Sequence, residues 1–181
     1  MHERVHNMRH KMAVSAKHYL PSIVYGGSDG AVSYFSLMAG AYGAGLPIKM
    51  LIAIGISNIF ADAFSMASAD YLSEDSRSES ERDQAFRSAT VTFFSFLLVG
   101  LFPLAPSLYA YNNGQADMHL PLSIFIISTI LTILAFSFIG YLRGKILLRS
   151  KWRTIMQSIM ICSISAAVAY YIGQMVSVIL M

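Results

Sequence analysis

The chain has 181 residues, of which 55% are hydrophobic and 13% are charged, and its mean hydropathy is +0.55. Soluble domains carry about 25% charged residues, so this composition excludes an ordinary soluble domain and indicates an all-α integral membrane protein. The net charge of +3 is explained by where lysine and arginine flank the apolar segments, and it does not indicate nucleic-acid binding.

Five apolar segments follow one another along the chain, each close to the 20 or so residues that a membrane-spanning helix needs. They cover residues 22–45, 48–72, 89–111, 119–142 and 154–179. A basic, histidine-containing arm at 1–21 precedes them, and a polar cytosolic loop at 73–88 separates the second segment from the third. The composition of this loop suits either a helical extension into the cytosol or a solvated connection. We therefore expect residues 22–181 to form one five-helix transmembrane domain.

The thirteen lysines and arginines predict the orientation of this bundle. Four lie in the arm, three in the loop after the second segment and five after the fourth, whereas Lys49 alone lies on the other side. The positive-inside rule then places the amino terminus in the cytosol and the carboxyl terminus outside. The first twenty residues contain no apolar core of the length found in cleavable signal peptides, so the first span is expected to direct insertion.

The arm contains histidines at four-residue spacing, namely His2, His6 and His10. On a helix these imidazoles would share one side and could collect metal ions. A mobile basic tail near anionic headgroups is the simpler interpretation. The single cysteine, Cys162, lies in the last span, so one chain can form neither a disulfide framework nor a cysteine metal cluster.

The first span is rich in glycine and begins after Pro21, which is expected to mark its entry. Gly26 and Gly30 form a GxxxG pair, a spacing that lets membrane helices approach closely, and we therefore predict a central position for this span. Close packing would bring Asp29 against a partner helix. The alternative is that Asp29 caps a broken helix start near the interface.

The second span carries a polar stripe at four-residue intervals: Asn58, Asp62, Met66 and Asp70. Residues four apart lie on one helix face, about 6 Å apart along the axis. A carboxylate at mid-membrane costs about 2.5 to 3.5 kcal/mol, which makes it a candidate functional group. A thioether between two carboxylates favours a first-row transition metal such as Fe²⁺ or Mn²⁺ over Mg²⁺ or Ca²⁺.

Two further side chains are auxiliary candidates for metal binding. Glu74 continues the stripe toward the cytosol, where a cation would meet it first, although a solvated face is the better single explanation of the charges of the loop. Met38, beyond Asp29 in the first span, offers a second thioether. Methionine in an apolar chain is more often a packing residue.

The third span contains Pro103 and Pro106, which predict a kink or an early end, and residues 112–117 predict a short external turn. The fourth and fifth spans hold no ionisable side chain and are expected to be packing helices. Five spans cannot divide into two equal inverted halves, so any symmetry of a transport path would come from a second copy of the chain.

The acids within the spans, Asp29, Asp62 and Asp70, have no lysine or arginine at similar depth. A buried carboxylate without a basic partner either takes up a proton or binds a cation. Metal binding then displaces protons and protonation expels metal, which is the coupling that a metal/proton antiporter requires.

Two strings also resemble the paired signatures of the vacuolar iron transporter family, including its nodulin-like and bacterial relatives: YGGSDG at 25–30 and ADAFSMASADYLS at 61–73. Membership would imply a five-span homodimer whose first and second helices line the pathway. It would also imply export of Fe²⁺, and often Mn²⁺, from the cytosol in exchange for protons. By motif position, the resemblance assigns pathway roles to Asp29, Met66 and Asp70.

The chain departs from that pattern in three respects. Many members have Glu where Asp70 stands, and Asp62 is not general to the family. Many also insert a carboxylate-rich cytosolic domain between the second and third spans, where this chain has only the short connection at 73–88. The resemblance is therefore to a short form, with the identity of the metal left open.

An enzyme is the main rival class, because an Asp-Gly pair with later aspartates is similar to the CDP-alcohol phosphotransferases. The spacing argues against it, since Gly26 stands where an Asp is needed and Asp62 and Asp70 are eight residues apart rather than four. We therefore predict no enzymatic activity and no cofactor, with Fe²⁺ or Mn²⁺ as cargo. A proton-coupled carrier of another solute and a non-transporting membrane subunit remain alternatives. The expected location is a prokaryotic cell membrane or a vacuole-type organelle membrane.

Overall fold

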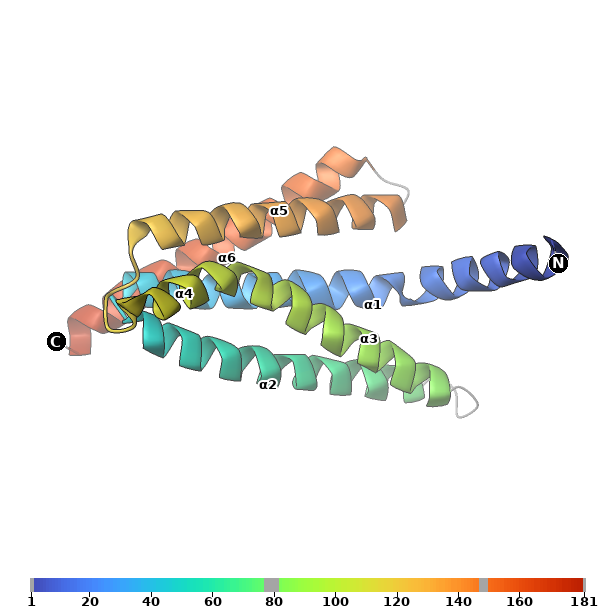
Figure 1. Ribbon diagram of the computed structural model, residues 1–181, viewed down its shortest axis with the longest axis horizontal. Coiled ribbons are helices and arrows are strands. Elements are labelled where there is room, and N and C mark those ends of the chain that lie inside the picture. The colour runs from blue at the N-terminus through green and yellow to red at the C-terminus, as the bar shows by residue number, and fades with distance from the viewer. Residues whose placement is uncertain (1, 77–81, 147–149, 181) are drawn as a thin grey trace.

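The computed structural model describes residues 2–76, 82–146 and 150–180, and the side chains of residues 19–76, 83–145 and 150–180. Within these ranges all regular structure is helical (Figure 1). The elements are α1 His2–Gly43, α2 Ile48–Asp75, α3 Arg82–Leu101, η2 Phe102–Leu104, α4 Ala105–Ala110, η3 Tyr111–Gln115, α5 Leu122–Ile146 and α6 Lys151–Leu180.

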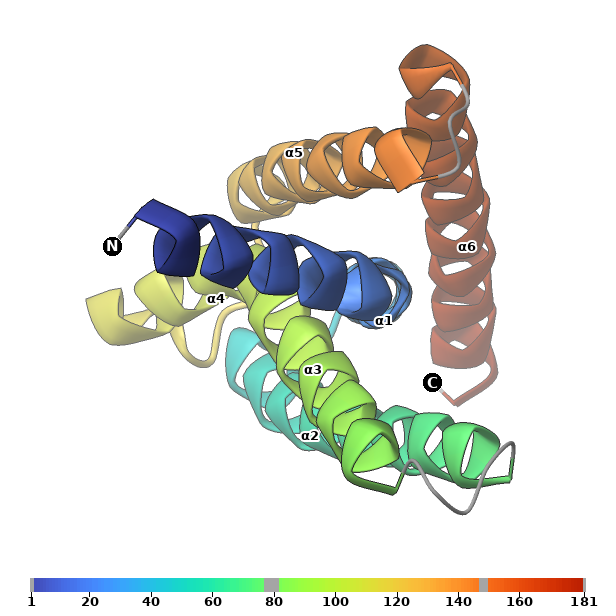
Figure 2. The same cartoon turned by 90° about the vertical axis from the view of Figure 1, so that its right-hand side faces the viewer.

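Helix α1 lies at the centre of the bundle, where it contacts α2, α3, α5 and α6 (Figure 2). Its glycines allow this position: a Cβ on Gly30 would lie 2.4 Å from the carbonyl oxygen of Phe96 in α3, and one on Gly26 would lie 2.6 Å from that of Thr92. Only glycine permits backbones to pass so closely. The predicted central position of the first span is confirmed.

The prediction that Pro21 marks a helix start is wrong, because Pro21 lies inside α1, which continues to His2. A proline within a helix removes one backbone hydrogen bond, and here its ring is exposed, so water or headgroups can satisfy the carbonyl that is left free. The interpretation of Asp29 as the cap of a helix start is excluded for the same reason. The arm is helical rather than an extended tail, and the side chains of His2, His6 and His10 lie outside the described residues.

The described part of the polar segment at 73–88 is largely helical, which agrees with the helical extension that its composition suits. Helix α2 continues through Asp75 and α3 begins at Arg82, so only the short stretch between them connects the two helices. The start of α3, residues 82–89, contains two Arg, one Gln and two Ala, which are good helix formers, so this polar segment extends the helix beyond the apolar segment.

The two prolines of the third segment break it as expected. Helix α3 ends at Leu101, a single 3₁₀ turn holds Pro103, and α4 begins with Ala105 and Pro106. Each proline lacks an N–H, so the α-helical hydrogen-bond ladder cannot run through this region. The chain reverses after Gly114, whose φ of +80° is a left-handed conformation that glycine adopts without strain.

The two turns at this end of the bundle are joined to each other. Ile48 N–H donates to the carbonyl oxygen of Met118 at 3.0 Å, and Lys49 N–H donates to that of Ala116 at 2.9 Å. The Lys49 ammonium forms an ion pair with Asp117. These bonds fix the start of α2 against the segment that leads into α5.

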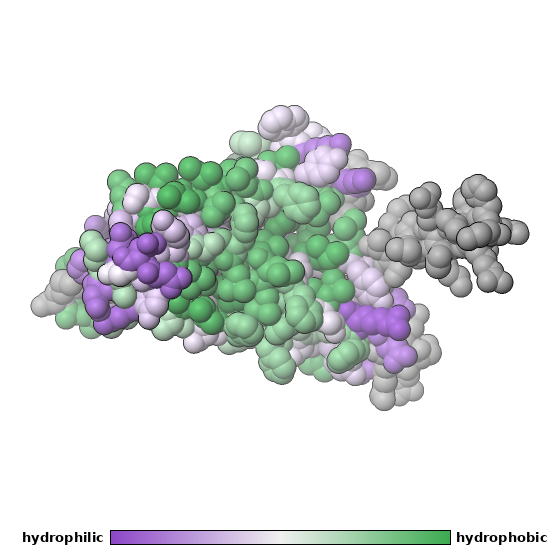
Figure 3. All heavy atoms as spheres, in the orientation of Figure 1, coloured by the Kyte–Doolittle hydropathy of each residue, from purple (hydrophilic) through white to green (hydrophobic). Residues whose placement is uncertain are grey.

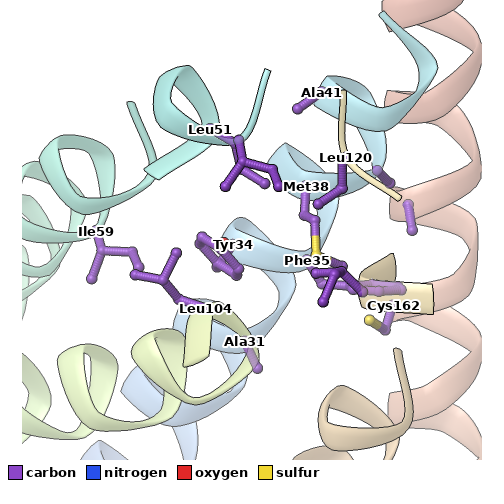
Figure 4. Packing of buried hydrophobic residues seen from close by; sticks show 14 of the residues in the cluster. Ala31, Tyr34, Phe35, Met38, Ala41, Leu51, Ile59, Leu104, Leu120 and Cys162 are labelled. Carbon is purple, nitrogen blue, oxygen red and sulfur yellow. The ribbon is translucent and has the colours of Figure 1, made fainter. Parts of the chain in front are cut away.

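The hydrophobic core lies around the carboxyl-terminal part of α1 (Figure 4). Tyr34 is 1% exposed and packs between α2 and α4, with its ring over Gly55, where a Cβ would lie 2.8 Å from the ring. Met38 is fully buried in the same cluster. Packing alone accounts for this methionine.

Among the described residues, four helical stretches are long and apolar enough to cross a membrane: Ile48–Asp75, Asp83–Gln115 (which runs through α3, η2, α4 and η3), Leu122–Lys145 and Lys151–Leu180. Apolar side chains cover the middle of the molecule, while hydrophilic residues gather at its two ends (Figure 3). Helix α1 falls outside this set because its central part is built from small and polar residues that face other helices. The chain is therefore an all-helical membrane protein with four candidate spanning helices around a central fifth helix.

Candidate cation site

Two carboxylates from different helices share one face of the bundle. Asp29 of α1 is exposed and Asp62 of α2 is half-buried, and the two lie close enough for electrostatic repulsion between them. Asp29 is placed there because Gly26 and Gly30 hold the adjacent face of α1 against α3. A cation between these carboxylates would relieve their repulsion.

Neighbouring residues of α2 complete this group. Asn58 Nδ2 donates to Asp62 Oδ2 at 2.7 Å, which fixes one carboxylate oxygen and leaves the other available. Met66 lies one turn further along α2, half-buried at the edge of the core. The structure thus brings together Asp29 and Asp62, with Asn58 and Met66 on the same stretch of helix.

Asp70 has different surroundings, because its carboxylate points toward α3. Asp70 Oδ2 accepts a hydrogen bond from Thr92 Oγ1 at 2.7 Å and another from Ser88 Oγ at 3.0 Å. Ser88 Oγ in turn lies 2.8 Å from Ser22 Oγ, so the network joins α1, α2 and α3. All three hydroxyl residues are buried. Asp70 lies about 12 Å along α2 from Asp62, two turns nearer the end of α2.

This hydroxyl network was not foreseen from the sequence. Ser88 and Thr92 are four residues apart and therefore lie on one face of α3, as side chains at that spacing do on any helix. Serine and threonine at such spacing are common in membrane helices and do not by themselves indicate which carboxylate they bond. The fold was needed to place them beside Asp70.

The auxiliary candidates are more widely spread. Glu74 is half-buried near the end of α2. Met38 lies in the core, on the face of α1 opposite to Asp29. Within the described side chains, no three His, Cys, Asp or Glu residues converge into a metal-binding group. In those same residues no ion pair joins Asp29, Asp62 or Asp70 to a lysine or arginine.

The face that carries Asn58 is hollowed and lined with small side chains. A groove of about 480 Å³ runs along α2 and is lined by Ala53, Ile54, Ser57, Asn58 and Ala61. Exposed small residues recur at every fourth position of α2: Ala53, Ser57, Ala61, Ser65 and Ala69. Such a stripe is typical of surfaces on which membrane helices pack together.

A larger groove of about 650 Å³ lies between α2 and α3, away from the carboxylates. Its lining is almost entirely apolar and includes Phe64, Phe86 and Phe94, with Asp29, Asp62 and Met66 absent from it. In a bilayer such a surface is covered by acyl chains. Size alone therefore does not identify the functional site of this protein.

The fold and this site define a class: helical membrane proteins that hold acidic side chains within their spanning segments. A comparison with protein families identifies the family within this class: the model of the VIT family matches residues 20–85 and 78–174. The chain belongs to this family, the vacuolar iron transporters.

Curated relatives named "Vacuolar iron transporter" match shorter stretches. The protein of Toxoplasma gondii is 40% identical over 55 residues, which is 30% of this chain and 18% of the relative. That of Plasmodium berghei is 31% identical over 77 residues, 39% of this chain and 28% of the relative. That of Plasmodium falciparum is 39% identical over 57 residues, 32% of this chain and 21% of the relative. The matches thus span less than a third of the length of each relative.

Proposed function

We propose that this protein exports a divalent transition metal, Fe²⁺ or Mn²⁺, from the cytosol in exchange for protons. Membership of a metal-transporter family supports transport, and the pairing of Asp29 with Asp62 is the observation that carries the mechanism. Two mutually repelling carboxylates without a basic partner retain either protons or a cation. Metal entering from one side would displace protons, and protons entering from the other would release the metal.

In this proposal α1 is the fifth spanning helix, with the amino terminus in the cytosol. Asp29 and Asp62 bind the metal with Met66, whose soft sulfur favours a transition metal over Mg²⁺. Asp70 and Glu74 lie toward the cytosolic end of α2 and attract the incoming cation. Asp70 keeps one oxygen free of the hydroxyls of α3 for this purpose.

We also propose that the working unit is a homodimer. In a single chain Asp29 faces outward, and a carboxylate facing lipid at this depth would cost about 2.5 to 3.5 kcal/mol. The groove on α2 and its stripe of small residues offer a surface on which a second copy can pack closely. Packing there would enclose the carboxylates in a polar pathway between the two chains.

Proteoliposomes loaded with a metal-sensitive dye test the proposal. Under a pH gradient we expect Fe²⁺ and Mn²⁺ to cross faster than in empty vesicles, and Asp29→Asn to lose most of the flux because it removes one binding charge. Asp83→Asn is the matched control, since Asp83 is an exposed carboxylate in the first turn of α3. Transport at the rate of empty vesicles would refute a transporter and favour a non-transporting subunit. Flux of an organic solute without metal flux would favour the other carrier.

A further inference from the structure

The carboxyl-terminal third of the chain has an uncompensated positive charge. All ten acidic residues lie at or before Asp117, so residues 118–181 contain none. The same stretch holds five basic residues within eleven positions: Arg143, Lys145, Arg149, Lys151 and Arg153. By contrast, the connection between α2 and α3 has five acids against three arginines at 74–87.

The helix ends that carry these cations are packed tightly against each other. Thr154 Oγ1 of α6 donates to the carbonyl oxygen of Gly140 in α5 at 2.9 Å. A Cβ on Gly144 would lie 3.0 Å from Lys151 Cα, so the two backbones are in contact. This packing turns the basic side chains outward: Lys145, Lys151 and Arg153 are exposed and Arg143 is half-buried, while Arg149 is outside the described residues.

Aromatic side chains lie among the cations. Trp152 is 76% exposed, and Lys151 Nζ lies 4.7 Å from the ring centroid of Tyr141, a cation–π contact. Trp and Tyr gather at the membrane–water interface, where one edge of the ring is apolar and the other is hydrated. Their presence places Lys145, Lys151 and Arg153 at the depth of lipid headgroups.

The acidic part of the chain lies elsewhere. In two perpendicular views the adjoining ends of α5 and α6 lie on the opposite side of α1 from the adjoining ends of α2 and α3 (Figures 1 and 2). The described acids of this connection, Glu74, Asp75 and Asp83, are therefore poorly placed to neutralise the basic helix ends. Among the described residues no ion pair joins Arg143, Lys145, Lys151 or Arg153 to an acid, so these cations are available to a negative partner from outside the chain.

We propose that the basic surface at the adjoining ends of α5 and α6, formed by Arg143, Lys145, Lys151 and Arg153 with Trp152, binds the headgroup of an anionic phospholipid. At headgroup depth the abundant anions are lipid phosphates, and clustered Lys and Arg donate charge-assisted hydrogen bonds to phosphate oxygens. The Trp152 ring would lie against the adjoining acyl chain. Because the cations flank a rigid helix contact, bound lipid would hold α5 and α6 together.

Reconstitution of the full chain in nanodiscs tests this proposal. The discs contain phosphatidylcholine with a minor fraction of phosphatidylglycerol, and native mass spectrometry counts the lipids that stay bound. We expect phosphatidylglycerol to be enriched several-fold over its bulk fraction for the wild type, and the enrichment to disappear in Lys151→Gln/Arg153→Gln. The charge-retaining pair Lys151→Arg/Arg153→Lys should keep it.

Single variants distinguish a specific lipid-binding site from nonspecific electrostatic attraction of anionic lipids to basic residues. Arg153→Gln should lose more bound phosphatidylglycerol than Arg87→Gln, which removes an exposed cation at the same end of the molecule. Equal loss in the two single variants, or unchanged enrichment in the double variant, would overturn the proposal. Displacement of the bound phosphatidylglycerol by millimolar inorganic phosphate would also overturn the proposal, because the surface would then be a site for free phosphate. Thermal unfolding of each variant in detergent identifies any that fail to fold.

Discussion

Asp62 and Asp70 lie on the same polar stripe of α2 but have different chemistry around them. Asp62 bonds to an amide of its own helix and interacts electrostatically with Asp29, whereas Asp70 bonds to two buried hydroxyls of α3. The first arrangement leaves two carboxylates whose mutual repulsion a cation would relieve. The second uses the carboxylate to join helices, so Asp70 has a structural role in addition to any effect on an incoming ion.

Thr92→Val tests the structural role of Asp70. The variant keeps the shape of the side chain but removes a hydroxyl that donates to the carboxylate at 2.7 Å. Loss of a hydrogen bond to a charged group is expected to lower the free energy of unfolding by about 1.5 to 3 kcal/mol. Thr90→Val is the control, because Thr90 Oγ1 bonds only the carbonyl oxygen of Phe86 in its own helix. Equal melting temperatures for the two variants in detergent would contradict this role.

Met66→Leu tests the choice of metal. Leucine keeps the volume of the side chain but removes the sulfur, so the preference for Fe²⁺ and Mn²⁺ over Mg²⁺ should fall several-fold in a metal-resolved flux panel. Met160→Leu, at an exposed position of α6, should leave the preference unchanged. An unaltered preference in Met66→Leu would remove the sulfur from the proposed ligand set.

The sequence was sufficient to single out these side chains, because charge within an apolar segment is visible without a structure. The sequence could not distinguish the surroundings of Asp70 from those of Asp62. Four-residue spacing shows that two residues share a helix face, but it does not show which other helix packs against that face. Met38 shows the same limit: as a thioether it is a candidate ligand, and only the fold shows it fully buried in the hydrophobic core.

At the scale of elements, the contact between α1 and α3 determines where Asp29 lies. Gly30→Ala should disturb it, because the added Cβ would meet the backbone oxygen of Phe96 at 2.4 Å and the helices would have to separate. Overpacking of this kind costs about 1 to 3 kcal/mol. Gly27→Ala is the matched control, since its Cβ would meet side-chain atoms of Val99 and Ser95 at 3.1 and 3.2 Å, which can adjust.

Thermal unfolding and metal flux of these two variants measure the effect. We expect Gly30→Ala to melt at a lower temperature and to transport more slowly than Gly27→Ala. If both variants behaved alike, the close approach of α1 and α3 would not be what positions Asp29.

The sequence predicted helices better than it predicted their limits. Pro103 and Pro106 are expected to kink or end the third segment, and a 3₁₀ turn does interrupt the α-helix there. Two backbone N–H groups are missing within four residues, so two α-helical hydrogen bonds are lost at this point. Pro21 was expected to begin a helix and does not. A single exposed proline removes only one hydrogen bond, so the neighbouring residues decide whether the helix continues.

For the whole molecule, the exposed position of Asp29 and the small-residue stripe on α2 lead to a homodimer. Ala61→Cys lies on that stripe, so we expect it to form a disulfide-linked dimer rapidly under mild oxidation in membranes. Ala167→Cys, an exposed position of the same residue type on α6, should cross-link far more slowly. The native Cys162 is buried and serves as the background in both variants.

Equal cross-linking of the two variants would contradict an interface along α2. The sequence alone does not predict this interface, because the stripe of alternating Ala and Ser indicates a packing surface only once the fold is seen to leave it uncovered.

The central claim is that protons and metal ions compete for Asp29 and Asp62. Simultaneous recording of metal entry and proton movement in the same vesicles, with one dye for each ion, tests it most directly. We predict proton efflux that begins with the addition of Fe²⁺ or Mn²⁺ and is lost in Asp29→Asn/Asp62→Asn. Metal entry without proton efflux, at a clamped membrane potential, would contradict the claim.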